Sequence, residues 1–261
     1  MSASQLIPTV ALALVLSTAH GAGNEAELQA IAEMVQASQR AGFVKHDFEK
    51  YIAPWADGSK MVLARGEKPG KHDNVMPVEK LRPVRKLRMS VPRGSGFLLN
   101  YFDEKFVREG DSVTLRWTAR SSFRGGHEAT SELYVLQKLD GAWKIVENRA
   151  WITNAKYGDR RQQFDEAGWG KLDAAVEVAR KAGDAFELAQ ALFEAYRFKE
   201  AHTAAVIASK KAAADDPEPW LIRGHSAILI GDADDGLGAF KKALKADPDA
   251  PVPDYVNPDS R

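Results

Sequence analysis

The sequence contains no cysteine, and its charges cancel. Without cysteine there is no disulfide, no thiolate metal site, no cysteine nucleophile and no lipid-attachment cysteine. The 36 Lys and Arg residues balance 36 Asp and Glu residues, whereas nucleic-acid and membrane-surface binding depend on an excess of positive charge. These absences exclude thiol chemistry, and we expect no nucleic-acid partner.

The chain also lacks an apolar run long enough for a helix that spans a bilayer, which needs about 20 residues. The run from Leu6 to Leu16 is shorter, and the small residues Ala19 and Gly21 follow it. This order is typical of a secretory signal peptide, although no Lys or Arg precedes Arg40. We therefore expect a signal peptide at residues 1–21, a periplasmic or secreted protein and no stable membrane insertion. A buried N-terminal helix or strand is the alternative.

The next part of the chain predicts helices followed by an antiparallel sheet. Helical periodicity predicts helices at 25–42 and 44–56, and short apolar segments predict strands at 59–66 and 97–102. Three longer strands are predicted at 111–123, 129–139 and 142–152. Asp140-Gly141 joins the last two, and Asp-Gly between alternating runs is a strong signal for a two-residue hairpin.

This turn also predicts the register of the last hairpin. It places Tyr134 opposite Glu147 and Glu132 opposite Arg149, while an earlier turn at 125–126 places Trp117 opposite Tyr134. Side chains alternate across a strand, so these residues are expected on one otherwise apolar face, with Trp151 nearby. We expect helices to cover that face.

Helices followed by a meander that ends in VLQKLDGAWKIVENRAW resemble the NTF2-like (SnoaL-like) superfamily, over residues 24–155. A D-G-x-W-K-I-V sequence recurs in the last hairpin of that family. The resemblance implies an α+β cone, in which helices pack on a curved antiparallel sheet and the inner face lines a pocket. It says little about activity, because the family includes enzymes and non-catalytic binding domains.

The candidate site lies on this inner face. The residues expected to bind a small apolar or amphipathic ligand are Trp117, Tyr134, Glu147, Arg149 and Trp151. In a catalytic version, Glu147 or Glu132 is the general base and Tyr134 donates a hydrogen bond. The alternative is a structural Glu132–Arg149 pair, because buried charges are tolerated when they are paired.

A basic stripe lies in the segment EKLRPVRKLRMSVPR, at 79–93, which fits the family pattern poorly. Its basic residues are Lys80, Arg82, Arg85, Lys86, Arg88 and Arg93. Such a stripe could hold an anion. A solvated loop or helix face is the alternative.

Residues 160–248 are rich in Ala, Lys, Glu and Asp and have helical periodicity. The segment PWLIRGHSAILIGDADDGLGAFKKALKADP resembles the tetratricopeptide (TPR) pattern, and the segment before it looks like a second copy. The residues at the expected offsets are Trp220, Gly224, Phe240, Ala243, Leu244 and Pro248. The resemblance implies a TPR-like helical domain and a protein partner, which Trp220 and Arg223 would contact.

The aspartates of the DADDG sequence could suggest a calcium loop, but their spacing fails. Counted from Asp232, position 12 of an EF-hand loop is Ala243 rather than Glu. We expect these aspartates to cap a helix. The six histidines show no ligand spacing. We expect no metal and no cofactor, and the Pro- and Asp-rich residues 249–261 predict a flexible tail.

The leading interpretation is an exported, non-catalytic accessory protein whose TPR-like segment binds another protein. The alternative is a small-molecule binding protein or a lyase- or isomerase-like enzyme that uses the cone. In a third hypothesis, the helical segment covers the mouth of the cone.

Overall fold

The computed structural model describes residues 22–90, 98–123, 126–158 and 160–256. The predicted signal peptide, at 1–21, lies outside the described residues. Within these ranges, no helix combines the length and the apolar character that are needed to cross a membrane.

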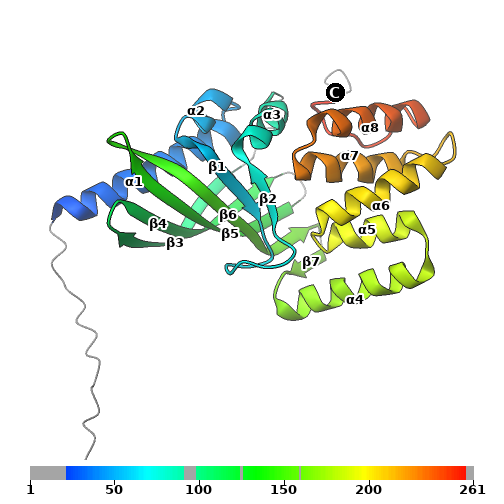
Figure 1. The fold of residues 1–261 in the computed structure, drawn as a ribbon, viewed down its shortest axis with the longest axis horizontal. Coiled ribbons are helices and arrows are strands. Elements are labelled where there is room, and N and C mark those ends of the chain that lie inside the picture. Colours follow the sequence, from blue (N-terminus) through cyan, green and yellow to red (C-terminus); the bar gives the residue numbers. More distant parts are fainter. Residues whose placement is uncertain (1–21, 91–97, 124–125, 159, 257–261) are drawn as a thin grey trace, which may run out of the picture.

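A curved sheet forms the centre of the N-terminal half of the chain (Figure 1). Its strands are β1 (Trp55–Leu63), β2 (Asn74–Pro77), β3 (Leu98–Glu109), β4 (Ser112–Phe123), β5 (Gly126–Leu139), β6 (Ala142–Tyr157) and β7 (Arg160–Gln163). The strand order is β2-β1-β6-β5-β4-β3, and β7 also pairs with β6. The pair β1–β6 is parallel, and the other described pairs are antiparallel.

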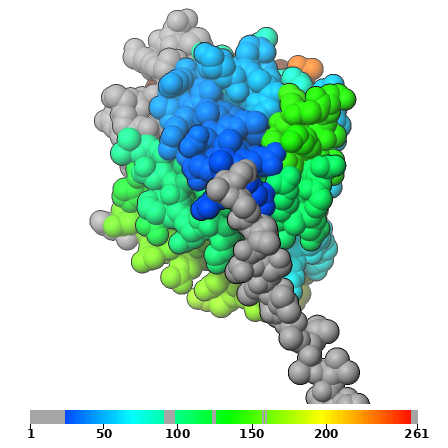
Figure 2. All heavy atoms as spheres, turned by 90° about the vertical axis from the view of Figure 1, so that its left-hand side faces the viewer, coloured from blue at the N-terminus to red at the C-terminus, as the bar shows by residue number. Residues whose placement is uncertain are grey.

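Three helices pack on this sheet: α1 (Ala22–Phe43), α2 (Phe48–Ile52) and α3 (Val78–Met89). Ile31 and Val35 lie one turn apart on α1 and are buried against Trp117 and Leu115 of β4. Figure 2 shows α1 lying between strands on both sides at the end of the molecule away from the C-terminal helices. We call this unit, from α1 to β6, the cone.

The predicted Asp140-Gly141 turn is confirmed. Both residues have positive φ, and Leu139 pairs with Ala142 directly beside them. The register continues as predicted through the pair of Leu136 with Ile145.

Beyond that pair the predicted register is wrong. A β-bulge shifts the pairing, so that Tyr134 lies opposite Asn148 rather than Glu147, and Glu132 lies opposite Ala150 rather than Arg149. A shift by one residue moves the side chains of β6 from Glu147 to Ile152 to the other face, up to a second register shift opposite Ala129 and Thr130. The β4–β5 register differs by two residues from the predicted one, and therefore leaves the faces unchanged.

The C-terminal region is helical, as predicted. Its helices are α4 (Glu166–Ala182), α5 (Ala185–Glu194), α6 (Phe198–Lys211), α7 (Glu218–Ile230) and α8 (Ala233–Ala246). Consecutive helices contact each other, from α4 to α8, and form a stack beside the open end of the cone (Figure 1). We call α4–α8 the helical segment.

The turn between α7 and α8 contains the aspartate cluster. Gly231 ends α7 with φ 86°, and the Asp232 side chain accepts a hydrogen bond from the Asp235 backbone N–H at 3.1 Å. The predicted capping role is therefore confirmed. Gly224 makes close packing possible, because a Cβ there would lie 2.6 Å from the Phe240 ring.

The end of the chain differs from the predicted flexible tail. Ala250 is buried, and Val252, Tyr255 and Val256 pack against the apolar cluster around Phe240. These side chains extend the α7–α8 hydrophobic contact, so the described part of the tail belongs to the helical segment.

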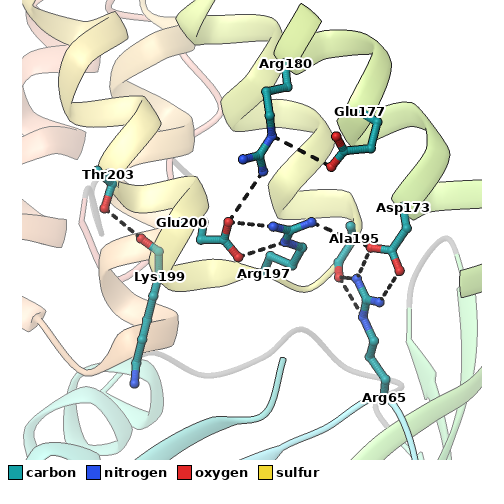
Figure 3. A network of polar contacts seen from close by, with 9 residues as sticks. All are labelled: Arg65, Asp173, Glu177, Arg180, Ala195, Arg197, Lys199, Glu200 and Thr203. Carbon is teal, nitrogen blue, oxygen red and sulfur yellow. Dashed lines mark hydrogen bonds and ion pairs between the residues drawn. The ribbon is translucent and has the colours of Figure 1, made fainter. Parts of the chain in front are cut away.

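An arginine network joins the helical segment to the cone (Figure 3). Arg65, just after β1, donates from Nη1 and Nη2 to the two carboxylate oxygens of Asp173 on α4, at 2.7 and 2.9 Å. It also donates to the backbone carbonyl of Ala195, after α5. The Arg65 guanidinium lies over the Trp169 ring of α4, and the Trp169 indole N–H donates to the Arg65 carbonyl.

Two apolar contacts complete this junction. Val84 and Leu87 of α3 pack with Leu221, Ile228 and Phe240 of the helical segment. Near β6 and β7, Phe164, Trp169 and Tyr196 pack against one another with ring centroids 5.1 to 5.7 Å apart. The antiparallel strands β6 and β7 thus lie between the two packed units.

We expect Gly224→Ala to lower the free energy of unfolding by about 1–3 kcal/mol, because the new methyl group overlaps the Phe240 ring. Gly238→Ala is the matched control, since a Cβ there meets nothing within 4 Å. That change should stabilise α8 by up to about 1 kcal/mol. Urea unfolding of both variants tests the prediction, and equal effects would contradict it.

We expect Arg65→Ala to lower the free energy of unfolding by about 2 kcal/mol, because charge-assisted hydrogen bonds to Asp173 and Ala195 are lost. Arg180→Ala removes a half-exposed guanidinium from the same network and should cost under about 1 kcal/mol. The two variants are compared by urea unfolding, and a larger loss for Arg180→Ala would disprove the anchoring role of Arg65.

Candidate functional site

A cavity of about 490 Å³ lies between the inner face of the cone and the helical segment. The sheet and α1 and α3 form most of its wall, and Phe193, Tyr196, Phe198, Ile228 and Leu229 close it from the helical segment. Most of the lining is apolar. Polar side chains that line it are Gln39, Arg85, Arg88, Ser121, Glu128, Thr130 and Glu132.

Glu132 is the centre of a hydrogen-bonded cluster on the cavity wall. Its Oε2 accepts from Trp117 Nε1 at 2.8 Å, from Gln39 Nε2 at 2.9 Å and from the Tyr134 hydroxyl at 3.1 Å. Gln39 also donates to the Tyr134 hydroxyl, and the Tyr101 hydroxyl donates to Gln39 Oε1 at 3.1 Å. Donors from α1, β4 and β5 thus fix one carboxylate oxygen in place.

Burial controls the protonation of this cluster. Desolvation raises the pKa of Glu132, while the hydrogen bonds from Trp117, Gln39 and Tyr134 oppose the shift. Burial and the nearby Glu132 also raise the pKa values of Tyr134 and Tyr101, so both hydroxyls stay protonated. A carboxyl group in a cavity with a raised pKa can serve as a hydrogen-bond donor or as a general acid or base.

Arg85 brings a positive charge to the opposite, helical wall of the cavity. Its residue is 7% exposed, and its guanidinium lies 5.0 Å from the Phe43 ring centroid and 5.7 Å from that of Tyr51. Its Nη2 donates to Met61 Sδ at 3.1 Å. Among the described residues no carboxylate lies within ion-pair distance of Arg85, and its buried Nε has no hydrogen-bond partner.

The predicted site residues divide into two groups. Trp117 and Tyr134 lie together with Glu132, as the alternation predicted, but beneath the cavity wall. The bulge moves Glu147 and Arg149 to the outer face, where Lys60 pairs with Glu147 at 3.0 Å and Asp73 pairs with Arg149 at 2.8 Å.

The predicted Glu132–Arg149 pair is therefore wrong, since Arg149 binds the loop after β1 instead. Trp151, also beyond the bulge, packs with Val62 and Leu133 and still borders the cavity.

The two residues expected to contact a protein partner are engaged inside the helical segment. Trp220 packs with the cluster around Phe240, and Arg223 pairs with Asp235 and lies 5.6 Å from the Trp220 ring centroid.

The sequence pattern missed Gln39 and the lining from α5–α7, and it left Arg85 as one member of a basic stripe. A signal for Arg85 was present: Leu81, Arg85 and Met89 follow one another at four-residue steps, which places Arg85 on the apolar face of a helix. Lys80 and Lys86 of the stripe are exposed, and Arg93 lies outside the described residues.

Over the described ranges, no group of three or more His, Cys, Asp or Glu side chains could hold a metal ion.

We expect the contribution of Glu132 to the free energy of unfolding to fall as pH rises above the ordinary Glu pKa of about 4.3. The raised pKa of Glu132 makes the native state keep a proton that the unfolded chain has lost, so rising pH favours unfolding until Glu132 ionises in both states. Glu132→Gln should flatten this part of the profile. Urea unfolding at a series of pH values measures it.

Glu49→Gln, at an exposed position on α2, is the control and should keep the wild-type slope. An unchanged slope in Glu132→Gln would disprove the assignment of this titration to Glu132.

Comparisons with known proteins concern the cone. Neither a protein-family model nor a curated protein matches the chain. Solved structures with low sequence identity match about half of it. An NTF2-like protein of unknown function from Pseudomonas putida KT2440 is 14% identical over 49% of this chain and 87% of that one, with a TM-score of 0.41. The association domain of C. elegans CaMKII is 16% identical, and the match covers 49% of this chain and 98% of that one, with a TM-score of 0.40. A hexachlorocyclohexane dehydrochlorinase, LinA-type3 from Novosphingobium barchaimii LL02, is 13% identical, and the match covers 52% of this chain and 92% of that one, with a TM-score of 0.42.

Proposed function

We propose that this protein binds a small apolar or amphipathic molecule in the cavity between the cone and the helical segment. The observation that carries the proposal is the cavity of about 490 Å³, which both units line and whose wall includes the partly buried Glu132 and the buried Arg85. Ligand sites are typically concave, mostly apolar and about 300–1,000 Å³ in volume, with a few fixed polar groups that orient the ligand. This cavity has each of these properties.

In this proposal the cone is NTF2-like and the helical segment consists of two degenerate TPR-like repeats, α5–α6 and α7–α8. The close contact of Gly224 with Phe240 and the capped turn at Asp232 support the repeat interpretation. The role of the repeats here is to close the cavity. Their Trp220 and Arg223 are engaged internally, which favours the covering role over binding a separate protein through these residues.

Catalysis is the second candidate, and Glu132 is the observation that favours it. Its raised pKa and its position on the cavity wall suit a general acid or base in a lyase- or isomerase-like reaction, and Tyr134 holds the carboxylate in place. Glu147 is less suited to this role, because it pairs with Lys60 on the outer face. Export through residues 1–21 remains part of the proposal on the basis of the sequence alone.

A neutral fluorescent probe, N-phenyl-1-naphthylamine, tests the proposed cavity. We expect a saturable rise in its fluorescence with the full chain, because its emission increases in apolar surroundings. Ala150→Leu adds bulk to a buried lining position and should reduce probe affinity at least about tenfold, since a few methylene groups occupy space the ligand needs.

Ala175→Leu makes the same substitution at an exposed position of α4 and should leave probe affinity unchanged. Thermal unfolding of both variants is measured first, so that affinities are compared between folded proteins. Equal probe binding by the wild type and Ala150→Leu would contradict the proposal.

A further inference from the structure

Arg85 is a buried cation that contacts no counterion among the described residues. The residue is more than nine-tenths shielded from solvent, and its Nε is buried without a hydrogen-bond partner in the described part of the chain. An Arg side chain remains charged in proteins, so the cost of burying it has to be offset by other groups. The rings of Phe43 and Tyr51 and the sulfur of Met61 offset part of it, because each has electron density that attracts a cation.

The charged groups near Arg85 do not complete its pairing. Burial raises the pKa of the Tyr51 hydroxyl, and Arg85 partly opposes that shift. Glu132 interacts with Arg85 electrostatically, but the two do not form an ion pair within 4 Å in the described structure, and Glu132 Oε2 already accepts three hydrogen bonds. Glu132 lies on the sheet wall of the cavity and Arg85 lies on the α3 wall, so one molecule in the cavity can contact both.

The surroundings of Arg85 select one class of anion. The guanidinium is planar and offers N–H donors in a fixed fork, which matches the two oxygens of a carboxylate. Arg88 also lines the cavity, but together with Glu128, whose charge is opposite; most of the remaining lining is apolar, which disfavours a dianion or a second charged group.

We propose, on the basis of the ligand-binding function proposed above, that the cavity takes a small monocarboxylate with an apolar body and that Arg85 binds its carboxylate. The apolar body then lies along the lining between α3 and the helical segment, which includes Val84 and Ile228. The described hydrogen bonds to Glu132 end on its Oε2, so its second carboxyl oxygen, Oε1, is left for a hydroxyl group of the ligand at the sheet wall.

The test uses decanoate, decanol and decyl phosphate as probes with a common apolar chain. Each is titrated into the full chain by isothermal titration calorimetry at neutral pH. We expect decanoate to bind at least about tenfold more tightly than decanol, which reflects a charge-assisted hydrogen bond, and more tightly than decyl phosphate. Tighter binding of decyl phosphate would overturn the choice of a carboxylate.

The variant Arg85→Met should weaken decanoate binding on the order of ten- to a hundredfold and leave decanol binding unchanged. Arg82→Met, on the same helix but with its side chain 40% exposed, is the matched control and should bind decanoate like the wild type. Because Arg85→Met removes a buried charge, its melting temperature in the absence of ligand should equal or exceed that of the wild type.

A purely structural Arg85 gives different results. In that case Arg85→Met has a lower melting temperature and the same preference between decanoate and decanol as the wild type, which overturns the inference. If Arg85→Met does not fold, Arg85→Lys replaces it, and unchanged decanoate affinity in that variant overturns the inference. If decanoate shows no preference over decanol while N-phenyl-1-naphthylamine still binds, only the carboxylate inference is rejected. If decanoate, decanol and N-phenyl-1-naphthylamine all fail to bind, the proposed function is rejected as well.

Discussion

The attachment of the helical segment to the cone through Arg65 is the contact on which the cavity depends. Arg65 connects the loop after β1 to Asp173 of α4 and to the Ala195 carbonyl after α5, two points of the helical segment that are distant in sequence. Ala195 is adjacent to Tyr196, which lines the cavity. One partly buried guanidinium thus fixes both the position of the helical stack and one part of the cavity wall.

The helix α3 has a related role on the other side of the junction. Leu81 and Arg85 face the cone, while Val84 and Leu87 pack against α7 and α8. A basic helix can be shared in this way because its lysines point to solvent, while its apolar residues, Arg85 and Arg88 point inward. The polar interior is divided between two walls: a carboxyl group with a raised pKa is held on the sheet, and an unpaired guanidinium lies on α3.

Much of the fold could be predicted from the sequence, because the signals are local. The Asp140-Gly141 turn, the alternation that brings Glu132, Tyr134 and Trp117 to one face, and the cap at Asp232 each depend on a few neighbouring residues. The bulge between Ile145 and Glu147 of β6 has no comparable local signal, because it depends on how the whole sheet curves. For that reason Glu147 and Arg149 were expected on the wrong face.

The sequence by itself determined the longer strands of the sheet, the helical character of the C-terminal region and the polar cluster on β5. Only the tertiary structure decided that these parts enclose one cavity. Arg65 and Asp173 are more than a hundred residues apart, and Arg85 becomes a buried cation only when α1, β1 and α3 come together around it. Such contacts follow from packing between distant segments, which no local pattern of residues specifies.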